Sequence, residues 1–398
     1  MSIYFILFTE LSEIPIDVSN GHQAKVNCLS KLGIFTFQPW ESDKMIDSKF
    51  FPALCTFLTC MLLSTVAVAQ TNPYQQVDAP SPPPHLNDGR WGEMIQVRVG
   101  PDGNVYVYHR CFKVVLGDPN VAPGHSDGLS ANCLGRWSGY PPILKFNSFG
   151  EFLDGFGTGL VGRPHGFSVD HEGNMWLTDV ALIENKMGAV VLKLSPEGEL
   201  LLTLGIPGVV GEGRDWFNRP ASVAVAQNGN IFVADGEGPN NRIVKFAPDG
   251  SYISEWGTTG SGPGQFNTPH DLAIDSRGRL FVGDRGNNRV QIFESDGTYV
   301  EQWHQFGRPS GIYINRVTDT LYVTDSTSNS RTNPGVQRGI YVGSASTGVV
   351  HYFIPDPDLE LTEQTRISGA SGITSSPDDS VIYAADVAPW QLRKYVKQ

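Results

Sequence analysis

Two histidines occupy equivalent positions in a repeating pattern, and imidazoles placed in this way could hold a metal ion. A turn followed by an apolar triplet with a central aromatic residue recurs, more loosely in the last two copies, at positions 103, 173, 229, 278, 319 and 379. His165 and His270 each stand eight residues before one of these turns. The equivalent positions of the other units hold Ile95, Ala221, Ser310 and Ser371. Imidazole nitrogens suit zinc, whereas the alternative is a structural pair satisfied by neighbouring units.

Two arginines occupy another repeated position, where a guanidinium group could bind a carboxylate. Aspartate recurs shortly after the triplets, at positions 179, 235, 284 and 325. We interpret these aspartates as architectural, because a residue present in most units serves the repeat by accepting backbone hydrogen bonds. The next position differs between units, and in two of them it holds Arg110 and Arg285. The planar fork of arginine fits a carboxylate, and a salt bridge to an aspartate of the unit is the alternative.

The units that position these side chains should be β-sheets. The chain contains 44 glycines and 27 prolines, 18% of its residues are charged and 11% are aromatic. This composition favours short strands separated by turns. The intervals between the turns are near the roughly 40 to 50 residues that a four-stranded unit needs. Because such a sheet cannot bury both faces alone, the pattern predicts an all-β, six-bladed β-propeller over residues 94–398, with both histidines facing its channel.

A set of motifs appears in order along residues 94–300. It comprises His109-Arg110, Arg163-Pro164-His165-Gly166, Asp235-Gly236, Pro269-His270 and Gly283-Asp284-Arg285. Together these motifs resemble the peptidyl-α-hydroxyglycine α-amidating lyase family, whose propellers are built from NHL repeats. The resemblance implies a lyase that cleaves the C–N bond of a small peptide ending in α-hydroxyglycine and releases a peptide amide and glyoxylate.

The resemblance also implies cofactors, site residues and a partner. His165 and His270 would hold zinc, and calcium would bind near the channel. Arg110 and Arg285 would hold the carboxylate of the substrate. A separate copper monooxygenase would supply the hydroxylated peptide.

Three positions depart from the family pattern. Ser371 stands where the family has a third histidine, and Gly372 where it has an aspartate that helps to bind calcium. Glu237 replaces the family's tyrosine, and it is a catalytic base if it is partly desolvated, or else an exposed loop residue. Two other functions therefore stay open: a hydrolase of lactones or esters, and a non-catalytic binding module.

The first seventy residues indicate export. Residues 50–68 carry no charge and lead to Ala67-Val68-Ala69, a small-x-small cleavage pattern. We predict a signal peptide at residues 45–69, an upstream extension or mis-assigned start at 1–44, and a linker at 70–93. The protein would be secreted, periplasmic or extracellular, or membrane-anchored if the signal is not cleaved. N-terminal sequencing of secreted protein should find Gln70 first, and retention of Met1 would contradict the cleavage.

The net charge limits the kinds of partner that the protein can bind, and the cysteine content indicates a disulfide. The formal net charge of −12 argues against a nucleic-acid partner, because phosphate binding needs clustered lysines and arginines. After the predicted cleavage no membrane span is expected. Cys111 and Cys133 are then the two remaining cysteines. In an exported protein this pair predicts a disulfide.

Overall fold

The computed structural model describes residues 72–113, 131–134, 138–183, 186–359 and 369–398, together with three strands near the N-terminus. The chain divides into two compact units, Met1–Val68 and Ala69–Gln398. In the first unit, an antiparallel sheet is formed by β1 (Ser12–Val18), β2 (His22–Leu29) and β3 (Ile34–Phe37). The predicted signal peptide lies outside the described residues. Among those residues no helix is long and apolar enough to cross a membrane.

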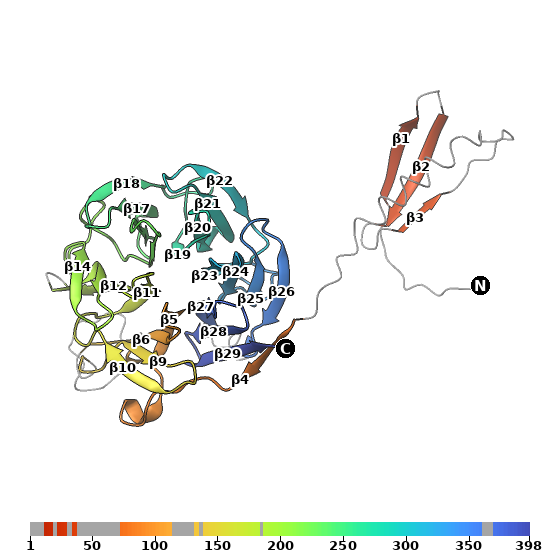
Figure 1. Cartoon of the computed structure of the whole chain (residues 1–398). Coiled ribbons are helices and arrows are strands. Elements are labelled where there is room, and N and C mark those ends of the chain that lie inside the picture. Colours follow the sequence, from red (N-terminus) through yellow and green to blue (C-terminus); the bar gives the residue numbers. More distant parts are fainter. Residues whose placement is uncertain are drawn as a thin grey trace. The chain divides into compact units, whose positions relative to one another are not determined.

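The second unit contains six four-stranded antiparallel sheets, arranged as blades in a ring (Figure 1). Residues from the innermost strand of every blade line the channel at its centre. The first three blades consist of β5 (Glu93–Val99), β6 (Val105–Arg110), β9 (Ile143–Phe146) and β10 (Phe152–Phe156); β11 (Pro164–Val169), β12 (Met175–Ile183), β13 (Met187–Leu194) and β14 (Leu200–Leu204); and β15 (Ser222–Val225), β16 (Ile231–Asp235), β17 (Arg242–Phe246) and β18 (Tyr252–Trp256). The prediction of a six-bladed all-β propeller is thus confirmed.

The other three blades continue the same order around the ring. They consist of β19 (Pro269–Ile274), β20 (Leu280–Asp284), β21 (Arg289–Phe293) and β22 (Tyr299–Trp303); β23 (Pro309–Asn315), β24 (Thr320–Asp325), β25 (Gly339–Ser344) and β26 (Val350–Pro355); and β27 (Ala370–Ser375), β28 (Val381–Asp386), β29 (Leu392–Lys397) and β4 (Tyr74–Val77). Two short strands, β7 (Phe112–Lys113) and β8 (Ala131–Asn132), form a separate ribbon beside blade 1.

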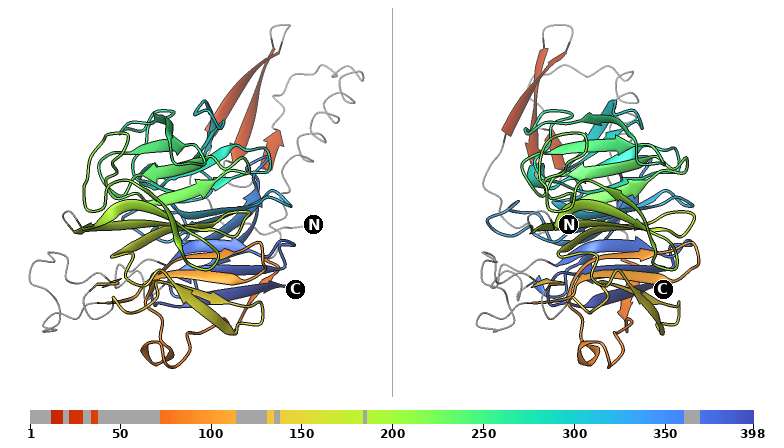
Figure 2. Two further views of the ribbon diagram at one scale, coloured as in Figure 1. Left: turned by 60° about the vertical axis from the view of Figure 1, so that its left-hand side comes forward. Right: turned by 90° about the vertical axis from the view of Figure 1, so that its left-hand side faces the viewer.

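Neighbouring blades share their cores. The side chains of each strand alternate between its two faces, so both faces of a blade carry apolar residues that need cover. Phe232 and Ile243 of blade 3, for example, belong to one buried cluster with Phe266, Leu272 and Phe293 of blade 4. Figure 2 shows the blades from the side as successive stacked sheets. Stacking therefore buries both faces and holds the innermost strands around the channel.

The ring is closed by the segment that the sequence predicted to be a linker. β4 pairs with β29, with Tyr74 opposite Lys397 and Val77 opposite Lys394. The Tyr74 hydroxyl also donates to the Asp379 carbonyl oxygen at 2.9 Å. The prediction of a linker throughout residues 70–93 is wrong, because a closed ring needs an outer strand for its last blade. Pairing β4 with β29 fastens the two ends of the propeller together.

The repeated aspartates are architectural, as predicted. The carboxylates of Asp179, Asp235 and Asp284 accept backbone N–H bonds of 2.7 to 2.8 Å from the segments that lead into their own blades. Asp325 does the same with the Arg308 N–H at 2.8 Å. Blade 6 carries Asp386 at the equivalent place, paired with Arg393, which the sequence pattern missed because the triplet there is irregular.

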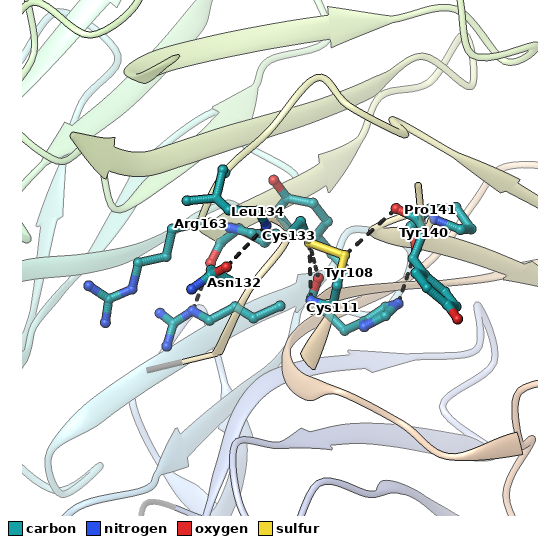
Figure 3. Close-up of a disulfide and its surroundings, with 12 residues drawn as sticks. Tyr108, Cys111, Asn132, Cys133, Leu134, Tyr140, Pro141 and Arg163 are labelled. Atoms are coloured by element: carbon teal, nitrogen blue, oxygen red, sulfur yellow. Dashed lines mark hydrogen bonds between the residues drawn. A yellow bond between two sulfur atoms is a disulfide. The ribbon is translucent and has the colours of Figure 1, made fainter. Parts of the chain in front are cut away.

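The predicted disulfide joins Cys111 to Cys133 beside blade 1 (Figure 3). Both cysteines are buried, and the Cys133 N–H donates to the Gly162 carbonyl oxygen at 2.8 Å. Gly162 belongs to the segment that enters blade 2 just before His165. The disulfide therefore ties the chain after Arg110 to the neighbouring blade.

Removing this disulfide should destabilise the propeller. Replacing both cysteines with alanine should lower the free energy of unfolding by about 3 kcal/mol, because the bond closes a loop with a sequence separation of 22 residues. Urea unfolding of the double variant under non-reducing conditions measures the change. A difference below about 0.5 kcal/mol would contradict the prediction.

Candidate functional site

The two histidines of the repeat meet near the N-terminal ends of the innermost strands. His165 lies in β11 of blade 2 and His270 in β19 of blade 4, and both are buried. Their ring centroids are 4.9 Å apart and the ring planes are inclined at 74°. The repeat phase therefore predicted correctly that these two side chains come together.

Each histidine is fixed through Nδ1 by the backbone of the next blade. His165 Nδ1 donates to the Ala221 carbonyl oxygen at 2.8 Å, and His270 Nδ1 donates to that of Ser310 at 2.5 Å. Because a carbonyl oxygen can only accept, Nδ1 carries the hydrogen in both rings. Burial lowers the pKa of His165 to about 4 and the pKa of His270 well below its usual value. In the neutral rings, Nε2 is the acceptor.

Glu237 brings a carboxylate to both Nε2 atoms. Its Oε1 atom lies 3.4 Å from His270 Nε2 and 3.9 Å from His165 Nε2. One potential ligand atom from each of the three residues lies within 4.8 Å of the other two. The Glu237 side chain is 24% exposed. The alternative of an exposed loop glutamate is therefore wrong.

Two glycines let the Glu237 loop pass close to its neighbours. A Cβ atom on Gly236 would lie 2.2 Å from the Pro269 carbonyl oxygen of blade 4, and one on Gly238 would lie 2.2 Å from that of Asn218. The Glu237 N–H donates to the Arg219 carbonyl oxygen at 3.1 Å. Side chains at 236 and 238 would push this loop away, so the glycines keep Glu237 beside the histidines.

The two arginines lie beside this cluster and pair with glutamates. Arg285 Nη2 donates to Glu237 Oε1 at 2.8 Å. Arg110 Nη1 lies 3.2 Å from Glu93 Oε2, and Arg110 Nε donates to the Pro164 carbonyl oxygen at 3.0 Å. Among the described residues neither arginine forms a salt bridge with a blade aspartate, so that alternative is wrong.

The surroundings of Glu237 keep its carboxyl group ionised. Burial alone would raise the pKa of Glu237, but the positive charges of Arg285 and Arg110 beside it hold the pKa well below its usual range. A general base works best when its pKa lies near the operating pH. This environment therefore suits a permanent negative charge better than a proton acceptor.

Arg308 supports the cluster and was missed by the sequence analysis. Its Nη1 atom donates to the Arg285 carbonyl oxygen at 2.9 Å, and its Nε atom donates to Thr327 Oγ1 at 2.9 Å. Arg308 stands before Pro309, two residues before the repeated position of blade 5. Blades 2 and 3 carry Arg163-Pro164 and Arg219-Pro220 at the same place. This recurring Arg-Pro pair is the signal that could have identified it.

The residues of the cluster fit zinc. Zinc binds imidazole nitrogen and carboxylate oxygen, and catalytic zinc sites commonly have three protein ligands with a fourth position left for substrate or water. His165, His270 and Glu237 supply two nitrogens and one carboxylate within a single small volume. Each imidazole has its other nitrogen fixed by a backbone carbonyl, as zinc-binding histidines usually do.

The residues at the implied calcium position do not fit that ion. A Cβ atom on Gly372 would lie 2.5 Å from Gln96 Cα and 2.9 Å from Gln96 Oε1, which leaves no space for a carboxylate. Arg98 Nη1 donates to Gln96 Oε1 at 2.7 Å and to the Ile373 carbonyl oxygen at 2.9 Å. Calcium needs six to eight oxygen ligands. Here the guanidinium of Arg98 binds the nearby oxygens, so we assign no role to calcium.

Sequence comparisons connect this propeller to NHL-repeat proteins. The NHL repeat model matches residues 217–246 and 266–293, in blades 3 and 4. The chain is 38% identical over 158 residues to human NHL repeat-containing protein 3, which covers 38% of this chain and 45% of that protein. A gluconolactonase structure from Xanthomonas campestris is similar over 78% of this chain and 87% of that chain at 16% identity, but its TM-score of 0.49 is too low to bear on function.

Two further relatives have names that state a chemistry. The chain is 43% identical over 211 residues to mouse peptidyl-glycine alpha-amidating monooxygenase, covering 49% of this chain and 20% of that protein. It is 33% identical over 174 residues to Drosophila melanogaster peptidyl-alpha-hydroxyglycine alpha-amidating lyase 1, covering 43% and 30%. The chain spans less than half the length of each of these curated relatives. The resemblance that the motifs indicated is confirmed.

Proposed function

We propose that this protein is a zinc-assisted lyase that cleaves peptidyl-α-hydroxyglycine into a peptide amide and glyoxylate. The observation that carries the proposal is the meeting of His165, His270 and Arg285 around Glu237 in one small cluster. The similarity to proteins named as α-amidating lyases supports this chemistry over others. The proposed substrate is a small peptide.

The reaction rearranges bonds within the substrate and needs no net oxidant or acid. The O–H bond of the hydroxyl group breaks and its oxygen forms the C=O bond of glyoxylate. The C–N bond breaks, and its electron pair stays on nitrogen. The hydroxyl proton ends on this nitrogen, which becomes the amide of the released peptide.

The arginines would bind the substrate carboxylate, and the histidines would hold the metal. Arg285 and Arg110 offer planar forks beside the cluster, and charge-assisted hydrogen bonds of this kind orient a carboxylate firmly. A zinc ion held by His165 and His270 would polarise the hydroxyl oxygen as a Lewis acid when bound. Glu237 was predicted as the base, but its low pKa makes proton transfer the weaker of its two candidate roles.

The hydroxylated substrate would come from a separate copper monooxygenase after export of the protein. This arrangement is part of the proposal. A peptide with an α-hydroxyglycine end has a free carboxylate and one hydroxyl on the same carbon. These are the two groups that the arginines and the metal would recognise.

A glyoxylate-release assay tests the proposed function directly. Purified protein, loaded with zinc, should release glyoxylate from an α-hydroxyglycine peptide faster than the zinc-free protein does. Ester or lactone turnover without glyoxylate release would indicate the hydrolase alternative. Peptide binding without any turnover would indicate the binding module.

A further inference from the structure

Three potential metal-ligand atoms face one another in the histidine cluster. The Nδ1 atoms of His165 and His270 donate to carbonyl oxygens, so Nε2 is the ring nitrogen that remains to face Glu237. Glu237 Oε1 is the atom that both Nε2 atoms approach, at 3.9 and 3.4 Å. A cation between these atoms would be bound by two nitrogens and one carboxylate oxygen.

The spacing of these atoms is close to that of a zinc ligand set. Zinc–nitrogen and zinc–oxygen bonds are about 2.0 to 2.2 Å long, so two ligands of a tetrahedral site lie roughly 3.3 to 3.6 Å apart. The 3.4 Å between Glu237 Oε1 and His270 Nε2 lies within this range, and the 3.9 Å to His165 Nε2 is slightly longer. All three ligand atoms lie within 4.8 Å of one another.

Arg285 already orients the carboxylate. Its Nη2 atom donates to Glu237 Oε1 at 2.8 Å, and Arg308 in turn donates to the Arg285 carbonyl oxygen. Hydrogen bonds to a ligating carboxylate fix its direction and are a usual feature of metal sites. The loop that carries Glu237 is also held by close backbone packing at Gly236 and Gly238. Glu237 is therefore set in place before any metal arrives.

We propose that Glu237, from blade 3, is the third protein ligand of a zinc site formed with His165 and His270. This inference rests on the proposed function for the use of the metal, and it assigns Glu237 to metal binding instead of proton transfer. It also explains how a chain with Ser371 on blade 6 can complete a three-ligand site. The fourth position would be left for the hydroxyl group of the substrate.

Zinc affinity of the purified full chain, measured by chelator competition, tests the proposal without reference to turnover. Glu237→Gln keeps an oxygen that Arg285 can bind but loses the charge. Zinc should therefore bind about 10-fold to 100-fold more weakly. Glu255→Gln is the matched control, because Glu255 forms a 2.8 Å pair with Arg242 in the same blade and lies outside the cluster. The control should bind zinc as the wild type does.

Two further variants keep the test decisive. Glu237→His retains a ligating side chain and should keep most of the zinc affinity. In the Glu237→Gln background, Ser371→His adds the imidazole on blade 6 and should restore affinity at least 10-fold. Thermal melting of each variant shows whether the propeller is folded.

The outcomes separate this proposal from the proposed function. Zinc binding by the wild type and its loss in Glu237→Gln would support the ligand even if no glyoxylate is released, in which case the lyase proposal alone fails. Equal zinc affinity in folded Glu237→Gln and wild type would overturn the assignment of Glu237 as a ligand. A wild type that binds no zinc would overturn it too. If Co²⁺-loaded wild type and folded, Co²⁺-loaded Glu237→Gln have the same visible spectrum, the assignment of Glu237 as a ligand is overturned as well.

Discussion

Replacing His270 with alanine should remove bound zinc and lower kcat/KM for α-hydroxyglycine peptides by at least about 100-fold. The reason is that His270 Nε2 is the histidine nitrogen nearer to Glu237 Oε1, at 3.4 Å, so its loss opens the ligand set. His165→Ala should have the same double effect. Metal analysis of the purified variants and a glyoxylate assay measure the two changes side by side.

An exposed histidine provides the control for these substitutions. His304 is exposed and lies after β22, outside the cluster, so His304→Ala should keep both zinc and turnover. Full zinc content in both His165→Ala and His270→Ala would mean that the channel histidines are structural. The binding-module function would then replace the lyase.

Replacing Arg285 with alanine should weaken recognition of the substrate and leave the metal in place. Losing one charge-assisted hydrogen bond to the substrate carboxylate should cost about 1.5 to 3 kcal/mol, a decrease of roughly 10-fold to 150-fold in kcat/KM. Zinc should remain stoichiometric at micromolar protein, because Arg285 contacts Glu237 without being a ligand itself. Kinetics and metal analysis of the same preparation measure both quantities.

Two comparisons sharpen the Arg285 prediction. Arg277→Ala is the control, because Arg277 belongs to the same blade and its side chain is 52% exposed. A substrate whose carboxylate is replaced by an amide should be turned over equally by wild type and Arg285→Ala. If Arg285→Ala lowers kcat/KM by the same factor for the carboxylate and the amide substrate, Arg285 does not recognise the carboxylate.

The sequence alone was sufficient for the blades and for the pairing of the two histidines. Each blade depends on local features, namely a turn, a short strand and alternating apolar side chains, and these recur with one phase along the chain. Equal phase means equal depth in a closed ring. His165 and His270 therefore met as predicted, although they are far apart in the sequence. The disulfide was predictable from the sequence as well, because only two cysteines remain after the predicted cleavage.

The register also identified Arg110 and Arg285, but it could not identify their partners. Arg285 pairs with Glu237 from the loop after β16, and Arg110 pairs with Glu93 at the start of β5. Glu93 is the cross-strand neighbour of Arg110 within blade 1. The distance between Arg285 and Glu237 instead depends on how blades 3 and 4 pack, which no single repeat encodes.

Only the tertiary structure decided the closure of the ring and the place of Glu237. β4 looks like a linker in sequence, because its four residues gain strand structure only by pairing with β29 at the other end of the chain. Glu237 resembles a solvated loop residue until Gly236 packs against Pro269 of the next blade. Periodicity reports which face of a strand is buried, whereas contacts between loops of different blades arise only when the whole ring is assembled.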